Sequence, residues 1–105
     1  MTINYDVVRI GKPRKDSNAE RIIHQNVKFL KFDIECFLED FELRNSDIIP
    51  ITIVIPARGY NVLFDVRDIH NKEVRLALNK QFKSRLFDRN RSILIGHIEN
   101  HINLI

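Results

Sequence analysis

The stretch SNAERIIHQNVKFLKFDIECFLEDFELRN, residues 17–45, decides the fold of this chain. It contains neither Gly nor Pro, and Ser17 and Glu20 have the spacing of a capping box, which satisfies unpaired N–H groups where a helix begins. Apolar residues then recur every three or four positions, which places them on one side of a helix. These residues form an apolar seam: Ile23, Val27, Leu30, Ile34, Phe37 and Phe41. The stretch is therefore predicted to be a long helix that packs by its seam on a sheet.

A second apolar stripe lies on roughly the opposite side of this predicted helix, and it consists of Phe29, Phe32, Cys36 and Leu43. A helix that is apolar on two sides either lies between two layers or uses one side for a partner. A chain of 105 residues has little material for a second covering layer. The second stripe is therefore predicted to bind a second copy of the chain or another protein.

A strand is the competing interpretation for the middle of this stretch. Residues 30–36 alternate between apolar and polar side chains, which is the periodicity of a strand. However, Asp and Glu are depleted in strands, and both Asp33 and Glu35 fall in this window. The seam also extends well beyond the alternating residues, so a helix is favoured.

Strands are predicted on both sides of the helix. Residues 2–10 alternate in polarity, and residues 11–16 carry the Gly and Pro of a loop. Residues 48–55 are almost continuously apolar and β-branched, as in a central strand that is buried on both faces. After a short loop at 56–59, residues 60–67 alternate again and complete a β-hairpin, with Val62, Phe64 and Val66 on its apolar face.

The C-terminal part is predicted to hold a second helix and a last strand. Asn71 or Asp68 can cap a helix that runs to about Phe87. Residues 91–98 form the last strand, for which a short helix through His101 is the alternative. The resulting order, β-α-β-β-α-β, is that of a ferredoxin-like split βαβ domain. We expect residues 1–105 to form a single α+β domain, a small two-layer sandwich with both helices on one face of the sheet.

Charge and composition limit the surroundings and the partners of the chain. The net charge is +3 with a pI near 9.2, which allows nucleic-acid binding without demanding it. Acidic residues gather in residues 33–47 and basic residues in residues 72–91, so the molecule has two oppositely charged regions. Cys36 is the only cysteine, and no signal peptide or membrane span is evident, so we expect a cytoplasmic protein that does not enter membranes. The abundance of Ile and Asn is typical of AT-rich genomes, such as those of many phages and plasmids.

Three groups of residues are candidates for contact with nucleic acid. Clustered cations bind phosphates by releasing counterions, and an Arg beside a Tyr can stack on an unpaired base. The candidates come from the loop before the long helix, from the hairpin and from the second helix: Lys12, Arg14, Lys15, Arg58, Tyr60, Lys80, Lys83 and Arg85. The alternative is that these side chains form ordinary solvated surfaces.

Catalytic and metal-binding signals are weak. Asp65, Arg67, Asp68 and His70 form a polar cluster that could serve acid–base chemistry or hold a divalent cation, although an ion pair between Asp65 and Arg67 and a helix cap at Asp68 explain it better. His97 and His101 have helical spacing for a shared metal, but no further ligands stand near them. We therefore predict no catalytic residues, no metal and no cofactor.

The sequence favours a non-enzymatic binding protein that self-associates and recognises a protein partner, as an inhibitor, immunity or adaptor protein does. A nucleic-acid-binding protein that uses the basic second helix is the first alternative. A small metal-free ribonuclease, which would depend on Arg67 or His70, is the second.

Overall fold

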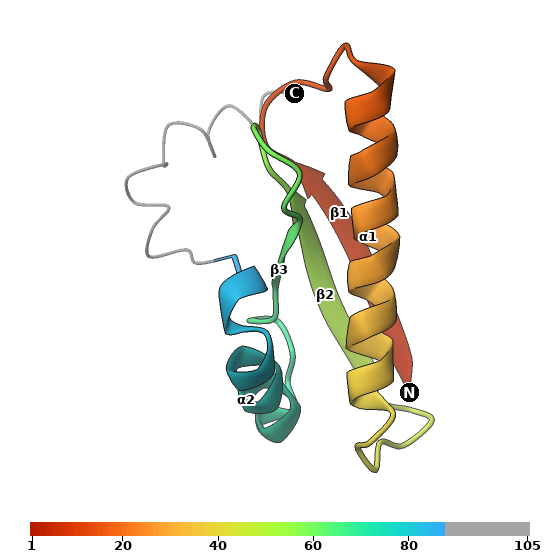
Figure 1. The fold of residues 1–105 in the computed structure, drawn as a ribbon. Helices are drawn as coiled ribbons and strands as arrows, with labels where there is room; N and C mark the ends of the chain where they lie inside the picture. The colour runs from red at the N-terminus through yellow and green to blue at the C-terminus, as the bar shows by residue number, and fades with distance from the viewer. Residues whose placement is uncertain (88–105) are drawn as a thin grey trace.

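The computed structural model describes residues 1–87 and has the elements of a small α+β protein (Figure 1). Along the chain they are β1 (Thr2–Arg9), α1 (Ser17–Leu38), β2 (Ile48–Ile55), β3 (Leu63–Asp65), α2 (Lys72–Gln81) and the 3₁₀ turn η1 (Lys83–Arg85). This confirms the α+β class. The predicted last strand at residues 91–98 and the pair His97 and His101 lie outside the described residues.

Within residues 1–87, the sheet has three strands in the order β1-β2-β3. β1 runs parallel to β2 along its whole length, with Tyr5 opposite Ile51, whereas β3 runs antiparallel to β2, with Phe64 opposite Ile53. In a split βαβ domain another strand separates the two strands that the first helix joins, and here these strands are direct neighbours. The hairpin connection keeps β3 on one edge of β2, which leaves the other edge of β2 for β1. The helices and strands β1, α1, β2, β3 and α2 follow one another along the chain as expected, but the strand pairing differs, so the split βαβ arrangement is not confirmed.

Residues 30–36 are helical, as the seam predicted. α1 is 22 residues long, and its seam residues Ile23, Val27, Leu30 and Ile34 are buried. Leu38, the last helical residue, is buried too, while Phe37 packs partly buried against the core. Burial of this one face therefore outweighs the strand-like alternation, because Asp33 and Glu35 remain exposed on the helix surface.

The two ends of α1 differ from the prediction. The cap is Asp16, whose Oδ1 accepts the Asn18 N–H at 2.9 Å, so that Ser17 is already helical and the predicted capping box is wrong. The helix ends at Leu38, with an N–H of the following residue bonded back to the last turn. As a result, Leu43 lies in the next loop and packs partly buried against the core, rather than on the exposed stripe of α1.

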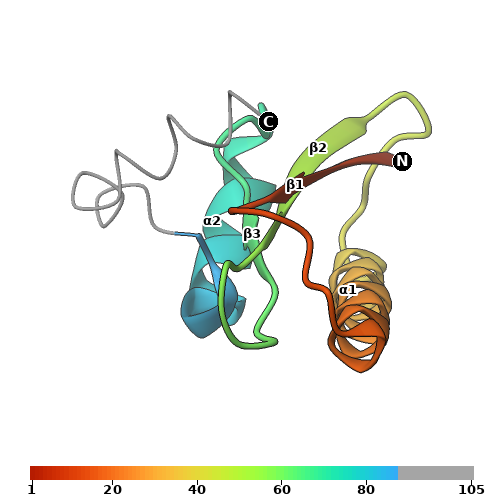
Figure 2. The ribbon, with the colours of Figure 1, turned by 90° about the horizontal axis from the view of Figure 1, so that it is seen from above.

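Among the described residues, one core cluster contains side chains from both helices, from β2 and from β3, and Figure 2 shows α1 and α2 beside the strands. The face of β2 that carries Ile49, Ile51 and Ile53 meets the seam of α1. Phe82, just after α2, packs edge-on against Phe37 of α1 at 5.6 Å and Phe64 of β3 at 5.5 Å between ring centroids. This aromatic contact fixes the end of α2, and so η1, beside α1.

α2 begins where the sequence predicted and ends earlier. Asn71 caps it, with Oδ1 accepting the Val74 N–H at 3.2 Å. The helix stops at Gln81 instead of near Phe87, and after η1 the chain turns extended, where Leu86 bridges to Phe64 in parallel. In the part of the chain that the structure describes, no helix is long and apolar enough to cross a membrane.

Two leucines of α2 test how this helix packs. Leu78 is fully buried, while Leu76, two residues earlier, is 54% exposed. We expect Leu78→Ala to lower the free energy of unfolding by about 2–5 kcal/mol because it leaves a cavity in the core. The matched Leu76→Ala variant should change it by less than about 0.5 kcal/mol. Urea denaturation followed by circular dichroism measures both, and equal losses would contradict this packing.

Candidate nucleic-acid interface

The loop before α1 and the hairpin loop after β2 meet at the end of the molecule where α1 begins. Arg14 Nη2 donates a hydrogen bond to the Pro56 carbonyl oxygen at 3.2 Å. The same guanidinium lies 5.4 Å from the centroid of the Tyr60 ring, within the range of a cation–π contact. A cation and an aromatic residue that the sequence offered as separate candidates are therefore in contact.

Glu20 anchors the first of these loops. Its two carboxylate oxygens accept hydrogen bonds from Arg9 Nη1 at 2.9 Å and Nη2 at 2.7 Å, and Oε1 also accepts the Arg14 N–H at 2.9 Å. The hydrogen bonds from Arg9 and then from the Arg14 backbone lower the pKa of this carboxyl. One carboxylate thus ties the end of β1, the loop and the first turn of α1 together, and it holds Arg14 in position.

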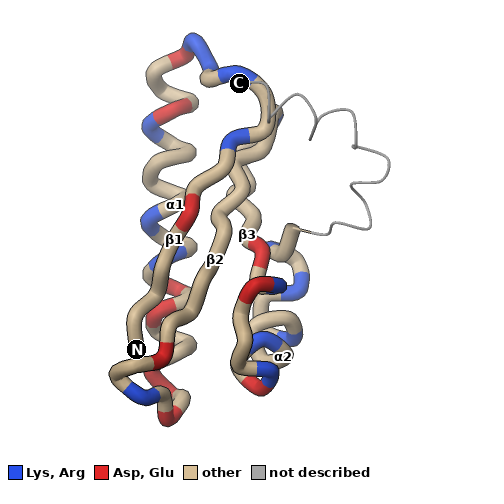
Figure 3. Tube along the Cα trace, turned by 180° about the vertical axis from the view of Figure 1, so that it is seen from behind, with Lys and Arg blue, Asp and Glu red and all other residues tan. Residues whose placement is uncertain are grey.

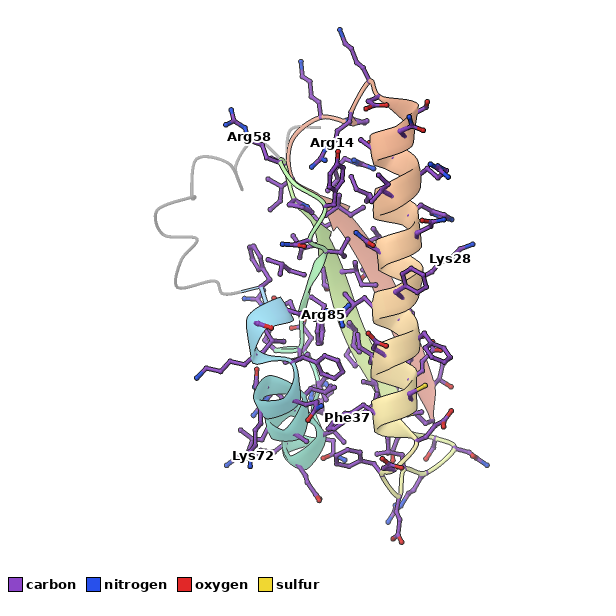
Figure 4. All side chains as sticks on the ribbon, in the orientation of Figure 1. Arg14, Lys28, Phe37, Arg58, Lys72 and Arg85 are labelled. Carbon is purple, nitrogen blue, oxygen red and sulfur yellow. The ribbon has the colours of Figure 1, made fainter. Side chains whose placement is uncertain are left out.

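The meeting of the two loops produces a basic end of the molecule. It consists of Lys12, Arg14, Lys15 and Arg58, of which Arg14 is half-buried and the other three are exposed. Figure 3 shows basic residues at this end and acidic residues toward the other end of α1, and Figure 4 shows Arg14 and Arg58 on the two adjoining loops. This separation of charge runs along α1 and differs from the one that the sequence indicated, which set acidic residues 33–47 against basic residues 72–91.

A groove of about 480 Å³ lies next to the basic end, between α1, the hairpin and η1. Two exposed aromatic rings line it, Phe29 with 64% and Tyr60 with 44% of its surface accessible. The remaining lining residues are mainly polar: Asn26, Asn61, Val62, Leu63, Ser84 and Arg85. The groove therefore combines aromatic faces, amide groups and a guanidinium.

Two hydrogen bonds fix the walls of the groove. Asn26 Nδ2 donates to the Tyr60 carbonyl oxygen at 2.7 Å, which ties the hairpin to α1. Arg85 Nη1 donates to Asp33 Oδ2 at 2.8 Å, which ties η1 to α1. Both ion-paired side chains remain partly exposed, and Arg85 keeps further N–H donors for a ligand. Figure 4 shows Arg85 between η1 and α1.

Gly59 makes the bend in the hairpin loop that separates Arg58 from Tyr60. Its φ is +75°, a conformation that residues with a Cβ adopt at a cost. Nothing lies within 4 Å of the position that a Cβ would take, so the backbone here is open to a ligand. This bend allows Arg58 to join the basic end while Tyr60 lines the groove.

The other predicted nucleic-acid residues lie apart from the groove. Lys80 near the end of α2 and Lys83 in η1 are exposed, and neither lines it. The cations beside the groove come from the loops and η1 rather than from α2 itself. Sequence reasoning missed Asn26, Asn61 and Ser84, because each belongs to a different element and no spacing along the chain links them.

The predicted partner-binding stripe is present on α1 without Leu43. Phe29 is 64% and Phe32 63% exposed, and Cys36 is exposed one turn further along. Phe29 lies at the edge of this stripe, because it also lines the groove. Partial desolvation raises the pKa of the Cys36 thiol, and the carboxylates of Glu39, Asp33 and Glu35 raise it further. This thiol is therefore a weak nucleophile at neutral pH.

The polar cluster at the end of β3 stabilises the turn that leads into α2. The Arg67 N–H donates to Asp65 Oδ1 at 3.0 Å, and Arg67 Nε lies 3.8 Å from a carboxylate oxygen of both Asp65 and Asp68. His70 is exposed. Within residues 1–87, no group of three or more His, Cys, Asp or Glu side chains is placed to hold a metal ion.

Comparison of the chain with protein-family models, with curated proteins and with solved structures finds no match. The function must therefore be inferred from the geometry of the groove and its surroundings.

The pH dependence of stability tests the anchoring role of Glu20. Because its folded-state pKa lies below the ordinary value of 4.5, its contribution to stability is fully present above pH 4.5 and is lost as the pH falls through the folded-state pKa. We expect Glu20→Gln to be less stable than wild type at neutral pH, with the difference vanishing in acid. Urea denaturation across the pH range measures this.

A double variant supplies the control for Glu20. Arg9→Gln combined with Glu20→Gln should cost less than the sum of the two single substitutions, because both break the same ion pair. A stability difference between wild type and Glu20→Gln that stays constant with pH would contradict the anchoring role.

Proposed function

We propose that this protein binds single-stranded nucleic acid in the groove between α1, the hairpin and η1. In this proposal Phe29 and Tyr60 stack on bases, while Arg14 and Arg58 at one end and Arg85 at the other contact phosphates. The observation that carries the proposal is the contact between Arg14 and Tyr60 at the mouth of a groove that exposes two aromatic rings.

Single strands fit these features better than a duplex does. Proteins that bind single strands without sequence motifs combine a positive path for the backbone with aromatic side chains on which bases stack. In a duplex the faces of the bases are already stacked inside the helix, so exposed rings such as Phe29 and Tyr60 would find no partner there. The amides of Asn26 and Asn61 offer both donors and acceptors to base edges.

Protein recognition is the second candidate function, and a specific observation favours it. Phe32 and Cys36 are exposed on α1 but do not line the groove, so nucleic acid in the groove would leave them uncovered. Exposed aromatic residues are frequent anchors of protein interfaces. The groove and the adjoining basic end together gather more of the candidate residues than this stripe does, so nucleic-acid binding is ranked first.

Substitutions of Tyr60 test the stacking. Tyr60→Ala should weaken binding of a labelled single-stranded RNA or DNA by about 1–3 kcal/mol, which is roughly a 5- to 150-fold rise in Kd. Tyr60→Phe keeps the ring and should bind nearly as wild type does. Lys72→Ala is the control for a surface substitution elsewhere, since Lys72 lies on α2 away from the groove (Figure 4). Fluorescence anisotropy measures all four proteins, and equal affinities would contradict the proposal.

Charge substitutions at the two ends of the groove should have opposite effects. Arg58→Ala should reduce the slope of log Kd against log salt by about 0.7, the value for one phosphate contact with a single strand. Asp33→Asn should tighten binding, because it removes a negative charge beside the groove and frees Arg85. Weaker binding by Asp33→Asn, with the fold intact by circular dichroism, would contradict the placement of phosphate near Arg85.

The same mixtures of protein and labelled RNA distinguish binding from catalysis. If the protein were a ribonuclease, labelled RNA would be cleaved during incubation, and the cleavage would be lost in His70→Ala. The proposal predicts RNA that stays intact on a denaturing gel while it remains bound.

A further inference from the structure

The face of α1 that points away from the sheet carries an apolar centre. Phe32 and Phe29 are each more than 60% exposed, and Cys36 adjoins them one turn along the helix. The residues of this outer face follow from helical spacing opposite the buried seam. They are Arg21, Gln25, Lys28, Phe29, Phe32, Cys36 and Glu39, and all except Phe29 lie apart from the groove.

Charge on the outer face changes sign at this apolar centre. Arg21 and Lys28 precede Phe32, whereas Glu39 follows it at the helix C-terminus. Glu35 is turned toward the sheet, because its Oε1 accepts the Tyr5 hydroxyl at 2.9 Å. A face that is basic at one end, apolar in the middle and acidic at the other end is complementary to a reversed copy of itself. A parallel copy would instead place like charges together.

We propose that two copies of the chain pair antiparallel through the outer faces of α1. The two-fold axis passes between residues 30 and 31, which sets Phe29 of each copy against Phe32 of the other. The same register sets Gln25 against Cys36 and Arg21 against Glu39. The members of each pair are almost equidistant from the axis, so an antiparallel copy brings the two members of a pair to the same height along the helices.

The area that this contact buries indicates the affinity that we expect for the dimer. A helix of 22 residues is about 33 Å long, so one helix face against another buries an area at the low end for specific complexes. The pair is therefore a reversible dimer that forms at micromolar to submillimolar concentrations. Because Phe29 belongs both to this contact and to the groove, the dimer is measured in the absence of nucleic acid.

Cysteine cross-linking tests the register. In wild type the two Cys36 residues lie on opposite sides of the axis, about 16 Å apart along the helices, which is too far for a disulfide. Gln25→Cys places a thiol opposite Cys36 of the other copy. We expect this variant to form a disulfide-linked dimer under mild oxidation at about pH 9, where thiolates are available. Gln25→Cys combined with Cys36→Ser should form none.

Two results of the cross-linking would overturn the proposal. Wild-type protein that cross-links through Cys36 as readily as the variant would indicate a different arrangement of the copies. If Gln25→Cys stays reduced, as Gln25→Cys with Cys36→Ser should, then position 25 of one copy does not meet Cys36 of the other.

Charge reversal tests the pairing independently. In sedimentation velocity, Arg21→Glu should weaken the dimer by about tenfold, and Arg21→Glu combined with Glu39→Arg should restore it, because every reversed charge again faces its opposite. Phe32→Asp should be a folded monomer, with the circular dichroism spectrum of wild type. Wild-type protein that is monomeric up to about 0.5 mM would overturn the proposal.

Discussion

The packing of α1 across β2 is the contact on which the rest of the molecule depends. The seam residues Ile23, Leu30 and Ile34 bury almost completely against the isoleucine face of β2, and this places a long helix along a very small sheet. With one face fixed in this way, the other faces of α1 have defined directions. One flank meets β1 through Glu20 and Glu35, and the opposite flank meets the hairpin and η1. The outer face is left to solvent or to a second copy.

The groove follows from this arrangement rather than from any local motif. Asn26, Phe29 and Asp33 lie on the flank of α1 that faces the hairpin and η1, and the first and last of them bond to those segments. Phe82 holds the start of η1 close to α1 through its contacts with two other rings. The space that remains between these elements is lined mainly by polar and aromatic side chains.

The sequence predicted the features that depend on local periodicity and capping. The buried face of α1, the central strand β2, the apolar face around Phe64 and the cap at Asn71 all follow from spacing and residue type. It did not predict that β1 would pair directly with β2, because strand order depends on hairpin geometry beyond any periodic pattern. It also assigned Glu20 to a capping box, although Arg9 competes for that carboxylate from across the fold. Arg14, Tyr60 and Arg85 were each candidates, but their convergence needs the tertiary structure.

The central claim, that the groove receives a single strand, is tested most directly by nuclear magnetic resonance. Backbone and side-chain amide signals of the labelled protein would be followed while a short uridine oligonucleotide is added at low salt. We predict that the shifts concentrate on the groove-lining amides of Asn26, Asn61 and Ser84, and leave Phe32 and Lys72 unchanged. Absent shifts, or shifts that spread over α2 while the groove signals stay in place, would contradict the account.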